Sequence, residues 1–104
     1  MSDARNPNTT CLHLVASAGE RSLRDCLAQS QPGDAIVFLD VGVLHLLTAP
    51  TSIGEGGGPT FLFAAADLEA HGLSACARAM GAGFAEDADV CALLAEHGHC
   101  LTWT

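Results

Sequence analysis

The chain has 104 residues, which suits one compact domain and leaves no room for a second. Hydrophobic residues make up 49% of the sequence and charged residues 15%, so we expect a packed core and not a disordered chain. Four arginines, no lysine and twelve carboxylates give a formal charge of −8, and a surface of this sign repels nucleic-acid phosphates. The composition therefore predicts a globular domain that does not bind nucleic acid directly.

Residues 1–10 are polar and lack the apolar stretch of a signal peptide, which predicts a flexible extension ahead of a single domain over residues 11–104. The apolar runs are much shorter than the roughly 20 residues that cross a bilayer. Five cysteines form an odd set without paired spacing, and this favours reduced thiols over a disulfide framework. We therefore expect a cytoplasmic protein without a membrane partner.

Two short apolar runs, Leu12 to Ala16 and Ala35 to Leu39, are typical of central strands in a parallel sheet. Between them, Ser17 to Glu20 fits a capping box and predicts a helix that ends at Gln31-Pro32-Gly33. The apolar segment Val41 to Leu47 predicts a short helix after the second strand. The two strands and the helix between them form a first β-α-β unit.

The segment Thr48 to Pro59 is rich in glycine and proline and predicts a surface loop. A third strand is expected at Thr60 to Ala64, and Asp67 is expected to cap a short helix that ends at Gly72. Farther along, Ala77 to Met80 gives a weak strand signal.

A helix is predicted from about Glu86 to His97, closed by Gly98, and His99 to Trp103 is the last predicted strand. Four or five strands that alternate with helices predict a single-domain α/β fold. We expect a doubly wound, mainly parallel, Rossmann-like sheet with right-handed crossovers and helices on both faces.

Cys26 lies inside the first predicted helix, and its thiol is the only strong nucleophile of that segment. The alternative is a buried cysteine that packs as a small hydrophobic side chain beside neighbouring leucines. Cys76 follows the predicted helix that ends at Gly72 and is the second candidate for a reactive thiol. We expect Cys11 and Cys91 to serve the core.

The cluster of His97, His99 and Cys100 contains good zinc ligands. Alternate residues of a strand face opposite ways, so the spacing of the last two argues against a metal site. The glycines of residues 54–58 lack the lysine of a P-loop and the order of a dinucleotide motif, so no bound cofactor is expected.

Two histidines and the single tryptophan complete the set of candidate residues. His13 and His45 lie in apolar surroundings, where a hydrogen-bonded core or interface histidine is commoner than a catalytic one. Trp103 is predicted to anchor the last strand or a subunit contact.

Several groups of residues follow one another in an order that resembles the DsrH/TusB family of sulfur-relay subunits. They are Leu12-His13-Leu14-Val15, the Ser-Leu-x-x-Cys of Ser22 to Cys26, Gly33-Asp34, Asp40-x-Gly42-Val43, Asp67-Leu68-x-Ala70-x-Gly72-Leu73, and Glu96-His97 followed by Trp103.

This resemblance implies a small Rossmann-like subunit of a heterohexameric sulfurtransferase in which three related proteins each occur twice. In such complexes a cysteine carries sulfur as a persulfide, toward thiolation of a tRNA wobble uridine or within sulfur oxidation. The principal carrier is usually the DsrE/TusD-type partner. DsrH-type members have a cysteine in the first helix, which matches Cys26, whereas TusB-type members can lack it.

Two main hypotheses follow from the resemblance. In the first, Cys26 is catalytic and passes sulfur to a partner such as a sulfur-carrier protein. In the second, the chain is a noncatalytic structural subunit. DsrE/TusD-like and DsrF/TusC-like subunits are the expected partners in a hetero-oligomer, with a homo-oligomer when the chain is isolated. A free-standing homo-oligomer without sulfur transfer of its own is a third alternative.

Overall fold

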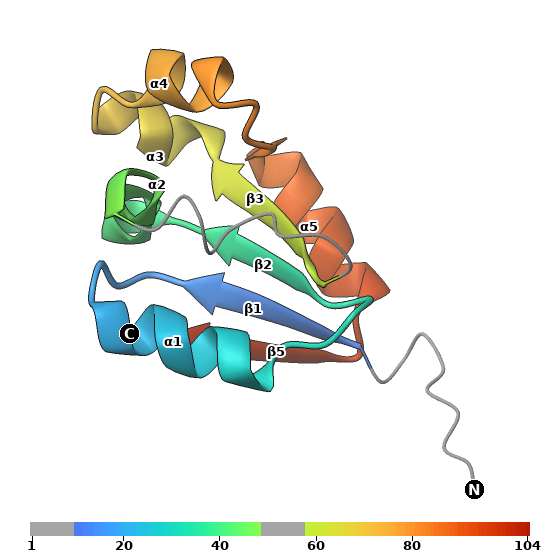
Figure 1. The fold of residues 1–104 in the computed structure, drawn as a ribbon. Coiled ribbons are helices and arrows are strands. Elements are labelled where there is room, and N and C mark those ends of the chain that lie inside the picture. The colour runs from blue at the N-terminus through green and yellow to red at the C-terminus, as the bar shows by residue number, and fades with distance from the viewer. Residues whose placement is uncertain (1–9, 49–57) are drawn as a thin grey trace, which may run out of the picture.

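The computed structural model describes residues 10–48 and 58–104, which form an α/β fold around one sheet (Figure 1). In chain order the elements are β1 (Cys11–Val15), α1 (Glu20–Gln29), β2 (Ala35–Phe38), the 3-10 helix η2 (Asp40–Leu44), α2 (His45–Thr48), β3 (Thr60–Ala64), α3 (Ala65–Ala70), α4 (Ser74–Ala79), β4 (Phe84–Ala85), α5 (Asp87–Glu96) and β5 (His99–Trp103).

All five strands of the sheet are parallel, in the order β4-β3-β2-β1-β5. The last strand therefore lies beside the first, and Leu14 of β1 is in register with Val37 on one side and Thr102 on the other. Every residue of β2 is buried, as expected of a central strand that is covered on both faces. The predicted parallel α/β architecture is confirmed.

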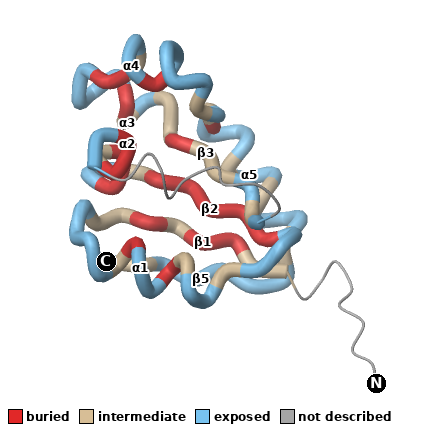
Figure 2. Tube along the Cα trace, viewed as in Figure 1, coloured by how far each residue is buried: buried red, intermediate tan, exposed pale blue. Residues whose placement is uncertain are grey.

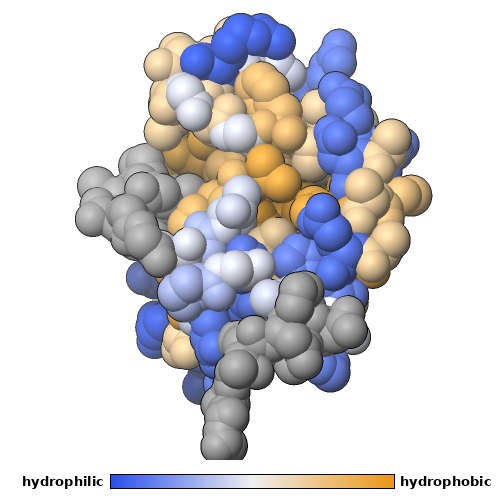
Figure 3. Space-filling model, turned by 90° about the vertical axis from the view of Figure 1, so that its right-hand side faces the viewer, coloured by the Kyte–Doolittle hydropathy of each residue, from blue (hydrophilic) through white to orange (hydrophobic). Residues whose placement is uncertain are grey.

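Apolar clusters lie on both faces of the sheet. The larger one joins Val15, Phe38 and Phe63 to side chains of α1, α2, α3 and α4. On the opposite face, α5 places Val90 and Leu93 against buried residues of β1 and β2. Figure 2 shows buried residues along β1 and β2 and on parts of β3 and of α1 to α4, whereas α5 is drawn as half-buried and exposed. Seen from the side at which the strands begin, hydrophobic side chains gather at the middle of the molecule (Figure 3).

The capping residues predicted for two helices are wrong. α1 begins after Gly19, which contributes no side chain, and the hydroxyl of Ser17 accepts a hydrogen bond from the Gly19 N–H at 3.0 Å. A serine hydroxyl that bonds the backbone two residues on forms a local turn instead of a cap. Asp67 lies inside the first turn of α3, and its carboxylate accepts the N–H of Asp40 at 2.7 Å.

The strand predicted at Ala77 to Met80 is also wrong, because α4 occupies most of that segment. Its alanines and Arg78 favour a helix, and the buried Ala77 fixes one face of this helix on the core. The fourth strand is β4, a two-residue strand that the sequence pattern did not indicate. The other predicted strands and helices are present with ends shifted by a few residues.

Two predictions fall mainly outside the described residues. They are the extension over residues 1–10 and the loop at Thr48 to Pro59, of which residues 1–9 and 49–57 are not described. Within residues 10–48 and 58–104, no helix has the length and apolar character needed to span a membrane.

Candidate functional site

Cys26 lies on the face of α1 that packs against the sheet. Its exposed fraction is 0%, and it belongs to the same apolar cluster as Leu23 of α1 and Val15 of β1. Burial, followed by negative charge on Cys11 and Asp34, raises the pKa of the Cys26 thiol to about 12. At neutral pH the group is therefore a protonated thiol inside the core, whereas the nucleophilic form of cysteine is an accessible thiolate.

The remaining thiols lie in different surroundings. Cys11 is half-buried at the start of β1, and burial, Asp34 and Cys100 raise its pKa. Cys76 is exposed on α4, where its thiol lies 3.8 Å from the sulfur of Met80. Cys91 is exposed on α5, so its predicted place in the core is wrong. The reason is that α5 packs through Val90 and Leu93 and leaves the Cys91 flank in solvent.

The most connected group of polar side chains is the cluster of His13, Asp34 and Trp103, hereafter the His13–Asp34–Trp103 cluster. His13 lies on β1 with an exposed fraction of 1%, and Asp34 precedes β2 with an exposed fraction of 3%. Nε2 of His13 is 3.2 Å from Oδ2 of Asp34, and the indole N–H of Trp103 donates to Nδ1 of His13 at 3.0 Å. The cluster thus joins β1, β2 and β5 at the α1 face of the sheet.

The hydrogen bond from the Trp103 indole identifies the tautomer of His13. A tryptophan N–H only donates, so Nδ1 of His13 is the acceptor and the ring hydrogen sits on Nε2, which donates to Asp34. The rings of His13 and Trp103 are also stacked, with centroids 6.0 Å apart. His13 is consequently a hydrogen-bonded core histidine, as predicted, and Trp103 anchors the last strand.

Asp34 is the acceptor at the end of this chain of hydrogen bonds. Besides His13, its carboxylate accepts the N–H of Cys11 at 2.9 Å and the N–H of Gln31 at 3.0 Å. Burial raises the pKa of Asp34, but the hydrogen bonds from Cys11, His13 and Gln31 outweigh it, and the pKa lies below the usual 3.8. The folded state therefore stabilises the ionised carboxylate.

This depressed pKa predicts a stability loss in acid. Because the folded pKa of Asp34 is the lower one, its contribution is complete above about pH 5 and is lost as the pH falls through 3.8 and then through the folded pKa. Urea unfolding at pH 6, 4 and 3 should show the wild-type advantage over Asp34→Asn shrinking as the pH falls. An advantage that is constant over this range would contradict the assignment.

At the other ends of the strands, the carboxyl ends, hydrogen bonds close the turns after β1 and β2. Nε2 of the buried His45 donates to the carbonyl oxygen of Ser17 at 2.7 Å, so this histidine is also a satisfied core residue. Asp40 follows β2 in a left-handed conformation with φ 52°, which aspartate tolerates better than most residues. Gly42 lies directly against the carbonyl group of Val15. These contacts fix the turns and leave the imidazole of His45 buried.

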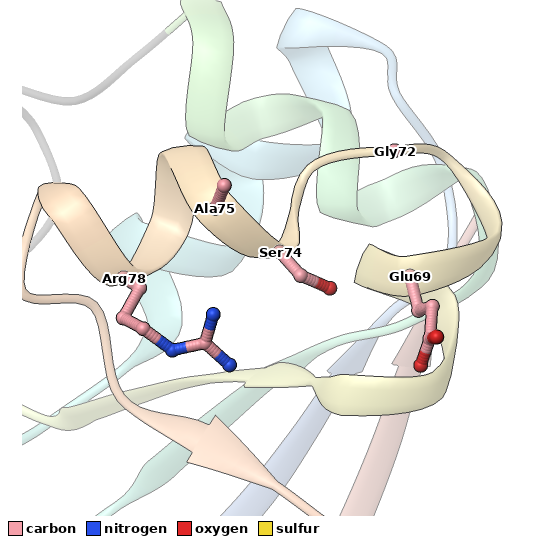
Figure 4. A pocket seen from close by; sticks show the side chains of 5 residues that line it. All are labelled: Glu69, Gly72, Ser74, Ala75 and Arg78. Carbon is pink, nitrogen blue, oxygen red and sulfur yellow. The ribbon is translucent and has the colours of Figure 1, made fainter.

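A shallow hollow of about 390 Å³ opens between α3 and α4, with Arg78 and Glu69 at its two sides and the hydroxyl of Ser74 between them (Figure 4). The guanidinium of Arg78 also lies over the ring of Phe84, 5.7 Å from its centroid. The lining side chains are partly or fully exposed, so the hollow does not hold a buried group prepared for chemistry. Its lining residues are Glu69, Gly72, Ser74, Ala75 and Arg78.

The candidate metal ligands near the carboxyl end lie on different elements or on opposite faces of β5. His97 ends α5, and its Nδ1 lies within hydrogen-bond distance, 2.7 Å, of the hydroxyl of Thr10. His99 and Cys100 are exposed residues of β5 whose side chains alternate between the faces of the sheet. Among the residues that the structure describes, no three His, Cys, Asp or Glu side chains converge as a metal site would require.

Sequence reasoning placed His13 and Trp103 in structural roles but missed their partner Asp34. One signal was available, because Asp34 directly precedes a fully apolar strand, at the level of Cys11 on the neighbouring strand and two residues before the level of His13. A carboxylate at the start of a buried strand needs donors, and adjacent strands supply them.

Comparison of the chain with known protein families, with curated proteins and with solved structures finds no match in any of the three.

Proposed function

We propose that this chain is a noncatalytic subunit of a cytoplasmic sulfur-relay assembly, similar to DsrH/TusB proteins, and that a DsrE/TusD-like partner supplies the sulfur-carrying cysteine. The order of residues from Leu12 to Trp103 supports the family, and the parallel α/β sheet is compatible with its Rossmann-like fold. The burial of Cys26 is the observation that favours the noncatalytic role in this proposal.

A sulfur carrier needs a thiolate that reaches a sulfane sulfur and a persulfide that the next thiol can attack. Cys26 meets neither requirement in the folded state, because its exposed fraction is 0% and its pKa is about 12. At pH 7 a thiol with this pKa is almost entirely protonated. In this proposal Cys26 packs α1 against the sheet, as Leu23 does.

Some large apolar side chains are exposed on the described surface. Large apolar side chains with exposed fractions between 38% and 55% occur on η2, α2, α5 and β5 and directly after α4: Val41, Leu47, Leu94, Leu101 and Met80. Exposed apolar side chains that gather into contiguous areas mark interaction sites, although single ones are normal on any protein. The proposed partners are DsrE/TusD-like and DsrF/TusC-like subunits, and the assembly delivers sulfur for tRNA wobble-uridine 2-thiolation or for sulfur oxidation.

Thiol labelling tests the role of Cys26. The folded protein is treated with a polysulfide and then with iodoacetamide, and peptide mass spectrometry measures modification at each cysteine. We expect the exposed Cys76, Cys91 and Cys100 to react within minutes, whereas Cys26 reacts only after denaturation in urea. A sulfur added to Cys26 in the folded state and removed by reductant would contradict the proposal.

Reconstitution tests the assembly. The chain is expressed together with DsrE/TusD-like and DsrF/TusC-like subunits, and we expect a stable complex that transfers persulfide sulfur equally well with wild-type Cys26 and with Cys26→Ala. Complex formation followed by loss of transfer in Cys26→Ala alone would instead make Cys26 the carrier. Absence of any complex would remove the sulfur-relay proposal itself.

A further inference from the structure

The edge strand β5 has one free side. Its five residues pair with β1 along their whole length, without a bulge, and among the described residues no strand lies on the other side. Four of the five residues are exposed, and Trp103 is half-buried. The opposite edge strand, β4, has only two residues and offers far less backbone for pairing.

Two hydrogen bonds show which backbone groups of β5 point outward. The N–H of His99 donates to Thr10, and the carbonyl oxygen of Trp103 accepts from Ala16, so both groups point toward β1. Backbone groups alternate sides along a strand, and Leu101 therefore also turns its groups toward β1. Cys100 and Thr102 turn their N–H and C=O groups to the free side.

The usual protections of an edge strand are absent from β5. Natural proteins block such edges with lysine or other charges, proline, bulges or short length. The sequence His-Cys-Leu-Thr-Trp has no lysine, arginine, carboxylate or proline, and its pairing with β1 is regular.

The charge around β5 also differs from that of the whole chain. The formal net charge is −8, yet α1, which lies beside β5, carries Arg21 and Arg24 against Glu20 and Asp25 and is formally neutral. The hydroxyl of Ser22 on α1 bonds the carbonyl of Thr104 and holds this helix next to the strand. Two copies that approach through this edge therefore bring a helix without formal net charge to the contact.

We propose that two copies of this chain associate by antiparallel pairing of their β5 strands about a twofold axis at Leu101. In this register Cys100 of one copy lies opposite Thr102 of the other, so all outward N–H and C=O groups of both residues form hydrogen bonds. Leu101 then faces its own copy in a non-hydrogen-bonded pair, where side chains lie closest, with Cα atoms about 4.5 Å apart.

This register also places compatible side chains opposite each other. Leu101 is 46% exposed in the single chain and would contact an identical apolar side chain across the axis. His99 would lie opposite Trp103, whose ring is already held by His13. The result is one continuous sheet across both copies. This pairing is independent of the sulfur-relay proposal and holds for the isolated chain.

Sedimentation velocity of the full chain in reductant, over 1 to 200 µM, tests the pairing. We expect a species of twice the chain mass of 10.6 kDa at the higher concentrations. Leu101→Lys should reduce the mass to that of one chain, whereas Leu94→Lys, on α5, should not. Leu94 is a matched control because its exposed fraction is 47%, against 46% for Leu101.

A second variant addresses the backbone. Thr102→Pro removes an outward N–H without removing a hydrogen bond to β1, and edge strands tolerate proline at such positions. We expect a folded, monomeric protein, with folding checked by circular dichroism. If Thr102→Pro does not fold, Leu101→Lys still decides the question.

Cross-linking tests the register. In a variant with Cys76, Cys91 and Cys100 replaced by serine, Leu101→Cys should give a disulfide-linked dimer under mild oxidation, and Leu94→Cys should not. A monomer at every concentration, a dimer that survives both Leu101→Lys and Thr102→Pro, or equal cross-linking at both positions would overturn the proposal.

Discussion

Gly42→Ala should lower the free energy of unfolding by about 3 kcal/mol or more, a large part of the roughly 5–15 kcal/mol that stabilises a domain of this size. A Cβ atom at Gly42 would lie 2.0 Å from the carbonyl oxygen of Val15 and 2.9 Å from its carbonyl carbon. Both are backbone atoms of a central strand. Relief of the clash therefore requires the turn or β1 itself to shift.

The carbonyl group of Val15 also accepts a hydrogen bond, so that a shift of this group costs additional free energy. The oxygen of Val15 accepts the N–H of Leu39 at 3.0 Å, and the N–H of Gly42 donates to the carbonyl of Leu39 at 2.9 Å. A displacement that makes room for a methyl group disturbs the end of the β1–β2 pairing and the first turn of η2 together. Overpacking and a weakened buried hydrogen bond then add.

Urea unfolding followed by circular dichroism measures this loss, and Gly58→Ala is the matched control. A Cβ atom at Gly58 meets no atom within 4 Å, and Gly58 is exposed, so its replacement should change the free energy of unfolding by no more than about 0.5 kcal/mol. Equal effects of the two substitutions would mean that the turn after β2 yields to the extra methyl group.

The strands were predictable where an apolar run marks them clearly in the sequence. The apolar run at β2 is buried on both faces, and an uninterrupted run of this kind is typical of a central parallel strand. By contrast, β4 has two residues, too few for any periodicity, and exists because Phe84 and Ala85 pair with Phe63 and Ala64 of β3. The alanine-rich α4 was misjudged because its helix propensity is strong but its apolar face is reduced to Ala77.

The candidate site was less predictable, because its properties depend on contacts between distant residues. The sequence placed Cys26 in a helix and left two roles open, since a helix position alone does not say whether a side chain faces solvent or the sheet. Cys91 was expected in the core for the same reason, although its side chain is exposed to solvent. The hydrogen bond between Trp103 and His13 spans 90 positions and has no local signal.

Asp34→Ala should destabilise the fold by about 3–5 kcal/mol, because it removes the acceptor of three donors in a site where Asp34 and His13 are almost fully buried. The N–H groups of Cys11 and Gln31 and Nε2–H of His13 would lose their partner together. Asp25→Ala, on the exposed face of α1, is the control and should change the free energy of unfolding by about 0.5 kcal/mol or less.

A double-mutant cycle separates the cluster from the loss of a single charge. Trp103→Phe keeps an aromatic ring on β5 but removes the indole N–H that holds Nδ1 of His13, so the ring orientation that serves Asp34 is no longer enforced. If His13 couples the two residues, the combined loss in Asp34→Ala/Trp103→Phe should fall short of the sum of the single losses by about 0.5–3 kcal/mol. Strict additivity in urea unfolding would show that Trp103 and Asp34 stabilise β5 and β2 independently, with His13 serving each of them alone.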